Sequence, residues 1–210
     1  MRNGILALTL VGLLSSCTSV VNTVVKEPIN PDLTSTPIGS DINDLKMDTF
    51  IGVNIKKADP ALKKAHVNVH VYNSIVLLTG EVGSAADKER AERLAKSQEN
   101  VSAVVNDLAI EPASSLTQRS KDAITTGQIK ALLVDAKDLQ SNAFKVVTER
   151  GVIYLLGRVT SREAQRASEI ARSSSVSGVV KVVRVFEIIT EEELKRISAQ
   201  PLSPQAQPKL

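Results

Sequence analysis

Few side chains in this sequence have the types and spacing that catalysis or metal binding requires. The 210 residues contain one Cys and two His. His66 and His70 are four residues apart, which is the spacing of a zinc-binding pair on a helix. They lie, however, in the segment 66–71, where valine occupies every second position, and this alternation predicts a strand. Because no third ligand accompanies them, we predict no metal site and no cofactor.

The residues that other common catalytic or nucleotide-binding sites require are missing as well. A serine nucleophile needs a nearby base, usually histidine, and both histidines belong to the predicted strand. The glycines are scattered singly, so the sequence has no glycine-rich loop to hold a nucleotide phosphate. We therefore expect no catalytic residues and no enzymatic activity.

The composition also limits the partners. Aromatic residues make up 2% of the chain, which is too few for the stacking platforms of single-stranded nucleic-acid binding or for an aromatic-lined ligand pocket. The formal net charge is +3, so an acidic partner must meet a local basic patch. We expect neither nucleic acid nor a small-molecule substrate.

The single cysteine, Cys17, has a sequence context that suggests a different chemistry. It follows Arg2, the apolar run Ile5–Leu14 and two serines, and the run is too short to cross a bilayer core that needs about 20 residues. The segment reads as a secretory signal. Leu14-Ser15-Ser16-Cys17 resembles the bacterial lipobox, which implies that residues 1–16 are a lipoprotein signal peptide and that Cys17 is acylated, as with palmitate.

The residues after Cys17 indicate location and tethering. Thr18 stands where lipoproteins kept at the inner membrane typically have Asp, so the resemblance implies sorting to the outer membrane. Prolines and small polar residues interrupt any periodicity after Val25, and we predict that residues 17–46 form a flexible tether. Residues 191–210 form the predicted C-terminal tail, in which 191–196 could form a short helix.

An internal repeat organises the rest of the chain. Three segments of the first half recur in the same order in the second half, at offsets of 77, 76 and 75 residues. The pairs are Ile75–Val82 with Val152–Val159, Arg90–Lys96 with Arg166–Arg172, and Val101–Val105 with Val176–Val180. A period of this length predicts two tandem small domains.

Each repeat has the periodicity of helix, strand, strand, helix, strand, which predicts an α+β fold. Ile51 and Ile55 lie on one face of the first helix, and Gly151 suits the tight turn of the second hairpin. The predicted elements of the first repeat are 48–55, 66–71, 75–82, 85–96 and 101–110. Those of the second are 124–134, 144–148, 152–159, 163–172 and 179–188.

This order of elements, the glycine-containing second strand and the ending Val176-Ser177-Gly178-Val179-Val180 resemble the BON domain. Two such domains behind a lipobox resemble the dual-BON-domain outer-membrane lipoproteins of the DolP group. The resemblance places BON domain 1 at residues 47–112 and BON domain 2 at residues 118–190. It implies a periplasm-facing, outer-membrane-anchored protein that binds anionic phospholipid through the first helix of its second domain and supports envelope integrity.

The charge distribution agrees with a lipid-binding second domain. Lys and Arg number eight against nine Asp and Glu between Asp48 and Glu111, a balance of −1, but eleven against seven between Lys121 and Glu187, a balance of +4. Two inward-facing rows are possible on the predicted helix, one through Thr125, Ile129 and Leu133 and one through Ile124, Gln128 and Leu132. The expected phospholipid-binding residues are Lys121, Ala123, Ile124, Lys130 and Leu133.

Position 123 departs from the family pattern, which has an aromatic residue just before Ile124-Thr125-Thr126. Ala123 gives a less favourable anchor at the membrane interface.

Two other functions stay open at this point. The chain also resembles a small lipoprotein described as a haemolysin, although no segment looks able to form a pore. An envelope scaffold that contacts proteins, among them outer-membrane assembly proteins, would use the same basic and apolar surface as lipid binding.

Overall fold

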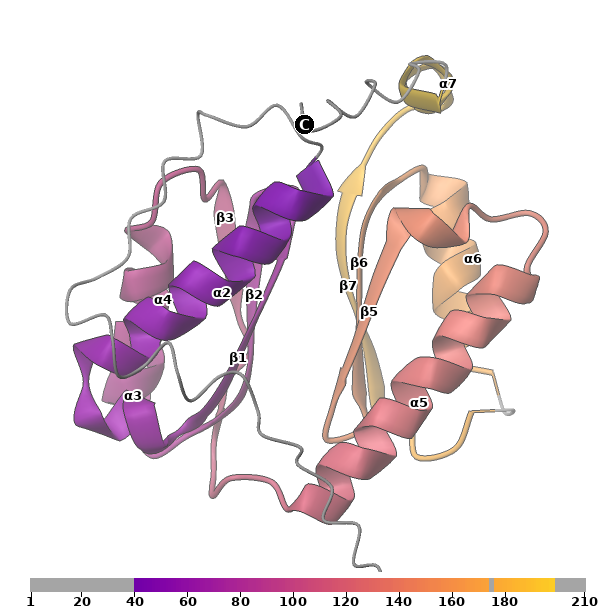
Figure 1. Ribbon diagram of the computed structural model, residues 1–210. Coiled ribbons are helices and arrows are strands. Elements are labelled where there is room, and N and C mark those ends of the chain that lie inside the picture. The colour runs from indigo at the N-terminus through magenta and orange to yellow at the C-terminus, as the bar shows by residue number, and fades with distance from the viewer. Residues whose placement is uncertain (1–39, 174–175, 199–210) are drawn as a thin grey trace, which may run out of the picture.

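The computed structural model describes residues 40–173 and 176–198, which form two α+β domains (Figure 1). The expected signal peptide, Cys17 and most of the expected tether lie outside the described residues. No helix in the described part is long and apolar enough to span a bilayer.

The first domain has a sheet covered by helices on one face. Its β1 and β2 are antiparallel, and β2 also pairs in parallel with β3 and β4, so β2 is the central strand. The elements are α2 (Ser40–Ala58), α3 (Pro60–Lys64), β1 (His66–Tyr72), β2 (Ile75–Val82), α4 (Ala85–Lys96), β3 (Ala103–Asn106) and β4 (Ala109–Ile110).

The second domain repeats this plan. An antiparallel hairpin of β5 and β6 is joined by β7, which pairs in parallel with the central β6. The elements are α5 (Leu116–Asp135), a 3₁₀ turn (Ser141–Ala143), β5 (Phe144–Glu149), β6 (Val152–Val159), α6 (Ser161–Ala171), β7 (Lys181–Ile188) and α7 (Glu191–Ser198).

The order predicted for each repeat is therefore confirmed, with differences at the boundaries. Helix α2 begins at Ser40, inside the segment expected to be tether, and α5 begins at Leu116, before the expected boundary at 118. Ser115 caps α5 by accepting a hydrogen bond from the Gln118 amide. The last strand of the first domain is split in two, and Asn106, at the end of the first part, donates a side-chain hydrogen bond to the Lys88 carbonyl.

Both hairpins are held by an aspartate on the first helix of their domain. Asp122 of α5 accepts the amide hydrogens of Arg150 and Gly151, each at 2.9 Å. Asp44 of α2 likewise accepts those of Asn73 and Ser74, at 2.6 and 3.3 Å. All four turn residues have positive φ, as a two-residue hairpin loop of this kind requires.

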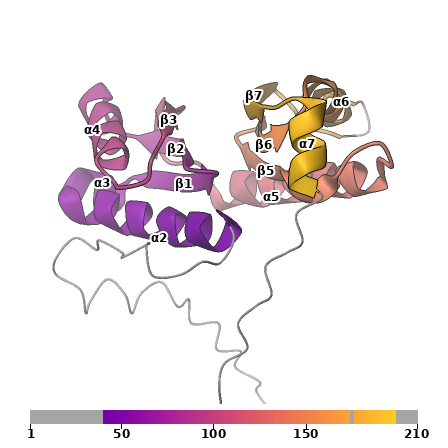
Figure 2. The same cartoon turned by 90° about the horizontal axis from the view of Figure 1, so that it is seen from above.

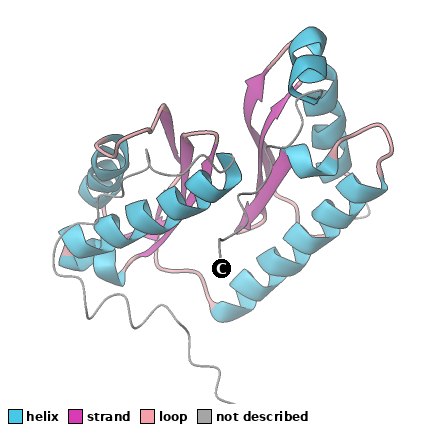
Figure 3. Cartoon of the chain, turned by 45° about the horizontal axis from the view of Figure 1, so that its top comes forward, coloured by secondary structure: helices cyan, strands magenta, loops and turns pink. Residues whose placement is uncertain are grey.

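The two sheets face each other, and the helices cover their outer sides (Figures 1 and 3). Each domain has its own core between sheet and helices, with Ile51 and Ile55 in the first and Ile129 and Leu133 in the second. A third apolar layer joins the sheets, built from the buried side chains of Leu77, Tyr154, Leu156 and Val185. Seen from above, the repeat-related helices α2 and α5 lie along the same side of the molecule (Figure 2).

Polar contacts complete this interface. The Tyr154 hydroxyl donates to Asp107 at 2.8 Å, and the Tyr72 hydroxyl donates to the Ala143 carbonyl at 3.1 Å. Lys145 Nζ lies 2.9 Å from Asp48 Oδ2. The domains therefore pack as one body, with both faces of each central strand buried.

Candidate functional site

The outer face of α5 carries most of the residues expected to bind lipid. Lys121, Ala123, Ile124 and Lys130 are all exposed, and Ile124 is 62% exposed. The buried row of this helix runs through Thr125, Ile129 and Leu133, which settles the choice between the two rows.

The expectation for Leu133 is corrected by this packing. Its side chain is 2% exposed and belongs to the core between α5 and the second sheet. A residue in this position stabilises the fold and does not reach a membrane surface.

The exposed side of α5 carries several large apolar side chains. Besides Ile124 it presents Leu116 and Val134, which are 79% and 67% exposed. At 100° per residue these three side chains lie on one side of the helix, with Lys121 on one margin and Lys130 on the other. We call Leu116, Lys121, Ala123, Ile124, Lys130 and Val134 the α5 outer face.

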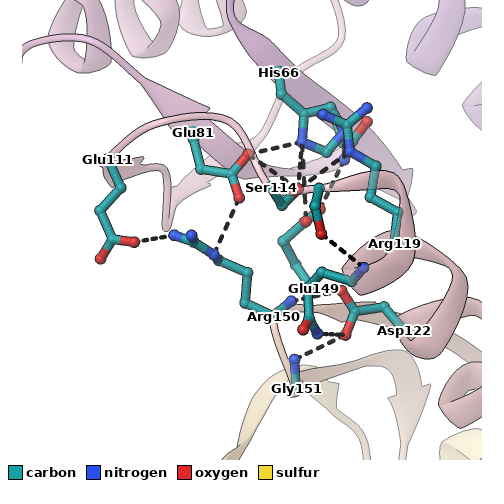
Figure 4. A network of polar contacts seen from close by, with 12 residues as sticks. His66, Glu81, Glu111, Ser114, Arg119, Asp122, Glu149, Arg150 and Gly151 are labelled. Atoms are coloured by element: carbon teal, nitrogen blue, oxygen red, sulfur yellow. Dashed lines mark hydrogen bonds and ion pairs between the residues drawn. The ribbon is translucent and has the colours of Figure 1, made fainter.

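A second group of polar and titratable side chains lies between the domains, where β1, β2 and β5 meet (Figure 4). His66 Nδ1 of β1 lies 2.9 Å from Glu81 Oε2 of β2 and 4.0 Å from Glu149 Oε1 of β5. Ligand atoms of all three residues lie within 4.8 Å of one another. The Ser114 hydroxyl is 3.4 Å from both His66 Nδ1 and Glu81 Oε2.

Further polar groups surround His66, Glu81 and Glu149, which we call the polar triad. Asn68 Nδ2 donates to Glu149 Oε2 at 2.8 Å and also lies 3.2 Å from His66 Nε2. Arg150 Nε lies 3.3 Å from Glu81 Oε1, although that oxygen accepts no hydrogen bond of good geometry. The Arg150 guanidinium also pairs with Glu111.

The two carboxylates of the triad are held in different electrostatic environments. Burial raises the pKa of Glu149, and the nearby charge of Glu81 adds to this effect. Burial would also raise the pKa of Glu81, but the hydrogen bond from His66 and the charge of Arg150 bring it below its ordinary value.

This triad was not predicted from the sequence, where His66 was considered as a metal ligand only together with His70. Four residues along a strand separate two side chains by about 13 Å, so these histidines cannot share a ligand. The available signal was that Glu81 is an acidic residue within a largely apolar strand and that Glu149 ends a strand directly before the hairpin turn. The repeat does not duplicate the site, since Arg158 stands at the position equivalent to Glu81.

Comparison with known proteins agrees with this architecture. The BON domain family matches residues 54–112 and 121–190. Outer membrane lipoprotein DolP of Haemophilus influenzae is 36% identical over 166 residues, which cover 78% of this chain and 82% of that protein. The outer-membrane location expected from the sequence is confirmed by this relative.

Two further relatives also match most of this chain and of their own lengths. The 21 kDa hemolysin of Actinobacillus pleuropneumoniae is 30% identical over 72% of this chain and 77% of its own length. Osmotically-inducible protein Y of Escherichia coli is 35% identical over 64% of this chain and 69% of its own length. With two matched domains and a DolP relative that spans most of its length, the chain belongs to the BON-domain family and, within it, to the dual-BON-domain DolP group.

Proposed function

We propose that this chain is an outer-membrane lipoprotein, anchored through Cys17 and facing mainly the periplasm, that binds anionic phospholipid through the α5 outer face and thereby supports envelope integrity. The observation that carries this proposal is the exposure of Leu116, Ile124 and Val134 on one helix face between two lysines. Its outer-membrane setting is supported by the lipoprotein DolP relative.

The chemistry of this face suits the boundary between lipid headgroups and acyl chains. Burying one large aliphatic side chain contributes about 1.5–3 kcal/mol, and each lysine near an anionic surface contributes about 1 kcal/mol. A helix lying in the plane of the interface presents this combination of an apolar stripe and flanking cations. In this proposal the exposed Ile124 makes the central apolar contact with the membrane interface.

Vesicle flotation tests the electrostatic contribution of the α5 lysines to phospholipid binding. The double variant Lys121→Glu with Lys130→Glu reverses two charges, so we expect it to bind vesicles rich in phosphatidylglycerol about tenfold or more weakly at 0.1 M salt. The difference should shrink in 0.5 M salt, where the screening length is much shorter. Lys63→Glu with Lys64→Glu, on the exposed end of α3, is the matched control and should bind like the parent.

The variant Ile124→Ser tests the contribution of apolar burial to vesicle binding separately. This change should weaken vesicle binding at both salt concentrations, because apolar burial is not screened. If both α5 variants bind vesicles like the parent, the α5 outer face is not a lipid site, and an envelope scaffold that contacts assembly proteins becomes the better explanation.

A second candidate function is haemolysis, which the relation to the 21 kDa hemolysin supports. Purified chain without its lipid, added to red cells over a range of concentrations, distinguishes the two. Dose-dependent release of haemoglobin would favour a direct toxin, whereas intact cells together with vesicle binding would favour the lipoprotein function.

A further inference from the structure

The geometry points to a divalent metal site of the zinc class between the two domains, with His66, Glu81 and Glu149 as its protein ligands. Neither the family match nor the relatives assign such a site. The three residues come from β1, β2 and β5, so a bound ion would connect the first sheet directly to the second.

The distances suit a small cation. In a tetrahedral zinc site with bonds of about 2.0–2.2 Å, neighbouring ligand atoms are about 3.3–3.6 Å apart. Here Nδ1 of His66 lies 2.9 Å from one carboxylate oxygen and 4.0 Å from the other, and the ligand atoms of all three residues fall within 4.8 Å. Changes of roughly 0.4 to 1.5 Å in these separations would bring the ligand atoms to the spacing of a coordinated ion.

The donor set indicates which metals would bind. One imidazole nitrogen with two carboxylate oxygens is a ligand combination used by zinc and its first-row neighbours, whereas magnesium and calcium prefer oxygen alone. Three protein ligands leave a fourth position for water. The Ser114 hydroxyl, 3.4 Å from both His66 Nδ1 and Glu81 Oε2, lies beside the triad and could hold that water.

Burial and charge also favour a cation. The Glu81 side chain is completely buried and that of Glu149 is 10% exposed, so two carboxylates are kept close together away from water. The surrounding group contains four carboxylates, from Glu81, Glu111, Asp122 and Glu149, against the two guanidinium groups of Arg119 and Arg150. The resulting formal charge of −2 is the charge that one divalent ion would neutralise.

Groups outside the triad would hold the ligands in place. Arg150 lies against the outer oxygen of Glu81, and Asn68 holds the outer oxygen of Glu149. Such contacts orient ligands in metal sites generally. A metal on Nδ1 requires the imidazole proton to be on Nε2, so His66 would no longer accept from the Asn68 amide, which keeps its hydrogen bond to Glu149 Oε2.

Titration calorimetry of the full chain, purified in detergent and stripped with a chelator, tests this site with zinc chloride as the probe. We expect one zinc ion per chain with a dissociation constant of about 10 μM or tighter. His66→Gln and Glu149→Gln should each weaken binding about tenfold or more. His70→Gln, which changes the other histidine of the same strand, should leave zinc binding unchanged.

Thermal unfolding distinguishes a variant that has lost the metal site from one that has lost its fold. At the same zinc concentration, zinc should raise the unfolding midpoint of the parent and of His70→Gln clearly more than that of a cooperatively folded Glu149→Gln. A dissociation constant for zinc weaker than about 10 μM in the parent would overturn the proposal. Equal zinc binding by folded Glu149→Gln and by the parent would overturn it as well, because the ion would then lie elsewhere.

Discussion

At the scale of single residues, His70 shows what burial between the sheets does to a titratable group. Its side chain is on β1, and Nε2 has no hydrogen-bond partner. Burial, together with the charge of Lys145, lowers the pKa of His70 from 6.5 to about 4. The folded chain therefore keeps this imidazole neutral in a range where the unfolded chain takes up a proton.

This difference predicts a specific loss of stability in acid. Between about pH 6.5 and pH 4 the unfolded state binds the additional proton, so protonation of His70 favours unfolding progressively as the pH falls through this window. His70→Gln should remove this dependence, and its stability relative to the parent should improve by about 2–3 kcal/mol from pH 7 to pH 4.

Urea unfolding of the parent and of His70→Gln at several pH values measures this effect. Other acidic groups affect both proteins equally, so the informative quantity is the difference between the two free energies of unfolding. Parallel curves across the window would contradict the assigned pKa of His70.

The polar triad shows where prediction from the sequence stops at this scale. Cys17 and the lysines of α5 could be proposed from the sequence because their suggested roles depend on neighbours in the sequence or on helical spacing. Glu149 contacts His66 only after the two domains have packed, and the local periodicity of the sequence does not indicate such a long-range contact. Leu133 was misplaced for a related reason, since two inward rows were compatible with the sequence of α5 and only packing chose between them.

At the scale of elements, the contact between the first helix and the hairpin is the part of each domain that the sequence did not reveal. Asp122 is 5% exposed and binds two backbone amides of the β5–β6 turn. Replacing it by alanine leaves both amides without their acceptor. We expect Asp122→Ala to lower the free energy of unfolding by about 2–4 kcal/mol.

Chemical unfolding of the intact chain measures this loss, with Asp135→Ala on the exposed end of the same helix as the control. Asp135→Ala should change stability by less than about 0.5 kcal/mol. Equal small effects of the two substitutions would show that the turn is held by its own conformation and does not depend on α5.

The elements themselves were largely predictable because their signals are local. Alternating valines placed β1, and alanine-rich amphipathic segments placed α4 and α6. Helix α2 was predicted too short, because the contacts that hold its first half come from elsewhere: Asp44 binds the β1–β2 turn and Met47 enters the core. The parallel pairing of the last strand with the second depends on long-range contacts, which periodicity does not specify.

At the scale of the whole molecule, the apolar layer between the sheets makes each domain depend on the other. Leu77 and Leu156 are fully buried in this layer and would be exposed in isolated domains. Expressed separately, residues 40–112 and 113–198 should each unfold at a midpoint lower by about 10 °C or more than the intact chain.

Thermal unfolding followed by circular dichroism tests this dependence, and the intact chain should unfold in a single transition. Two separate transitions in the intact chain, or isolated halves as stable as the whole, would show that the sheets do not support each other. The sequence contained a hint of this packing, since the continuous apolar runs at 75–78 and 152–156 are typical of strands buried on both faces.

The asymmetric bridge from His66 and Asn68 to Glu149 also bears on how a duplicated chain evolves. Two copies joined by a flexible linker can accumulate changes independently. Here a change at Glu149 alters the surroundings of residues that the other copy contributes. The two halves are therefore expected to evolve together, so that a substitution in one copy is compensated by a substitution in the other. For the same reason, a single domain could not be transferred to another protein unless the sheet face that it exposes were redesigned.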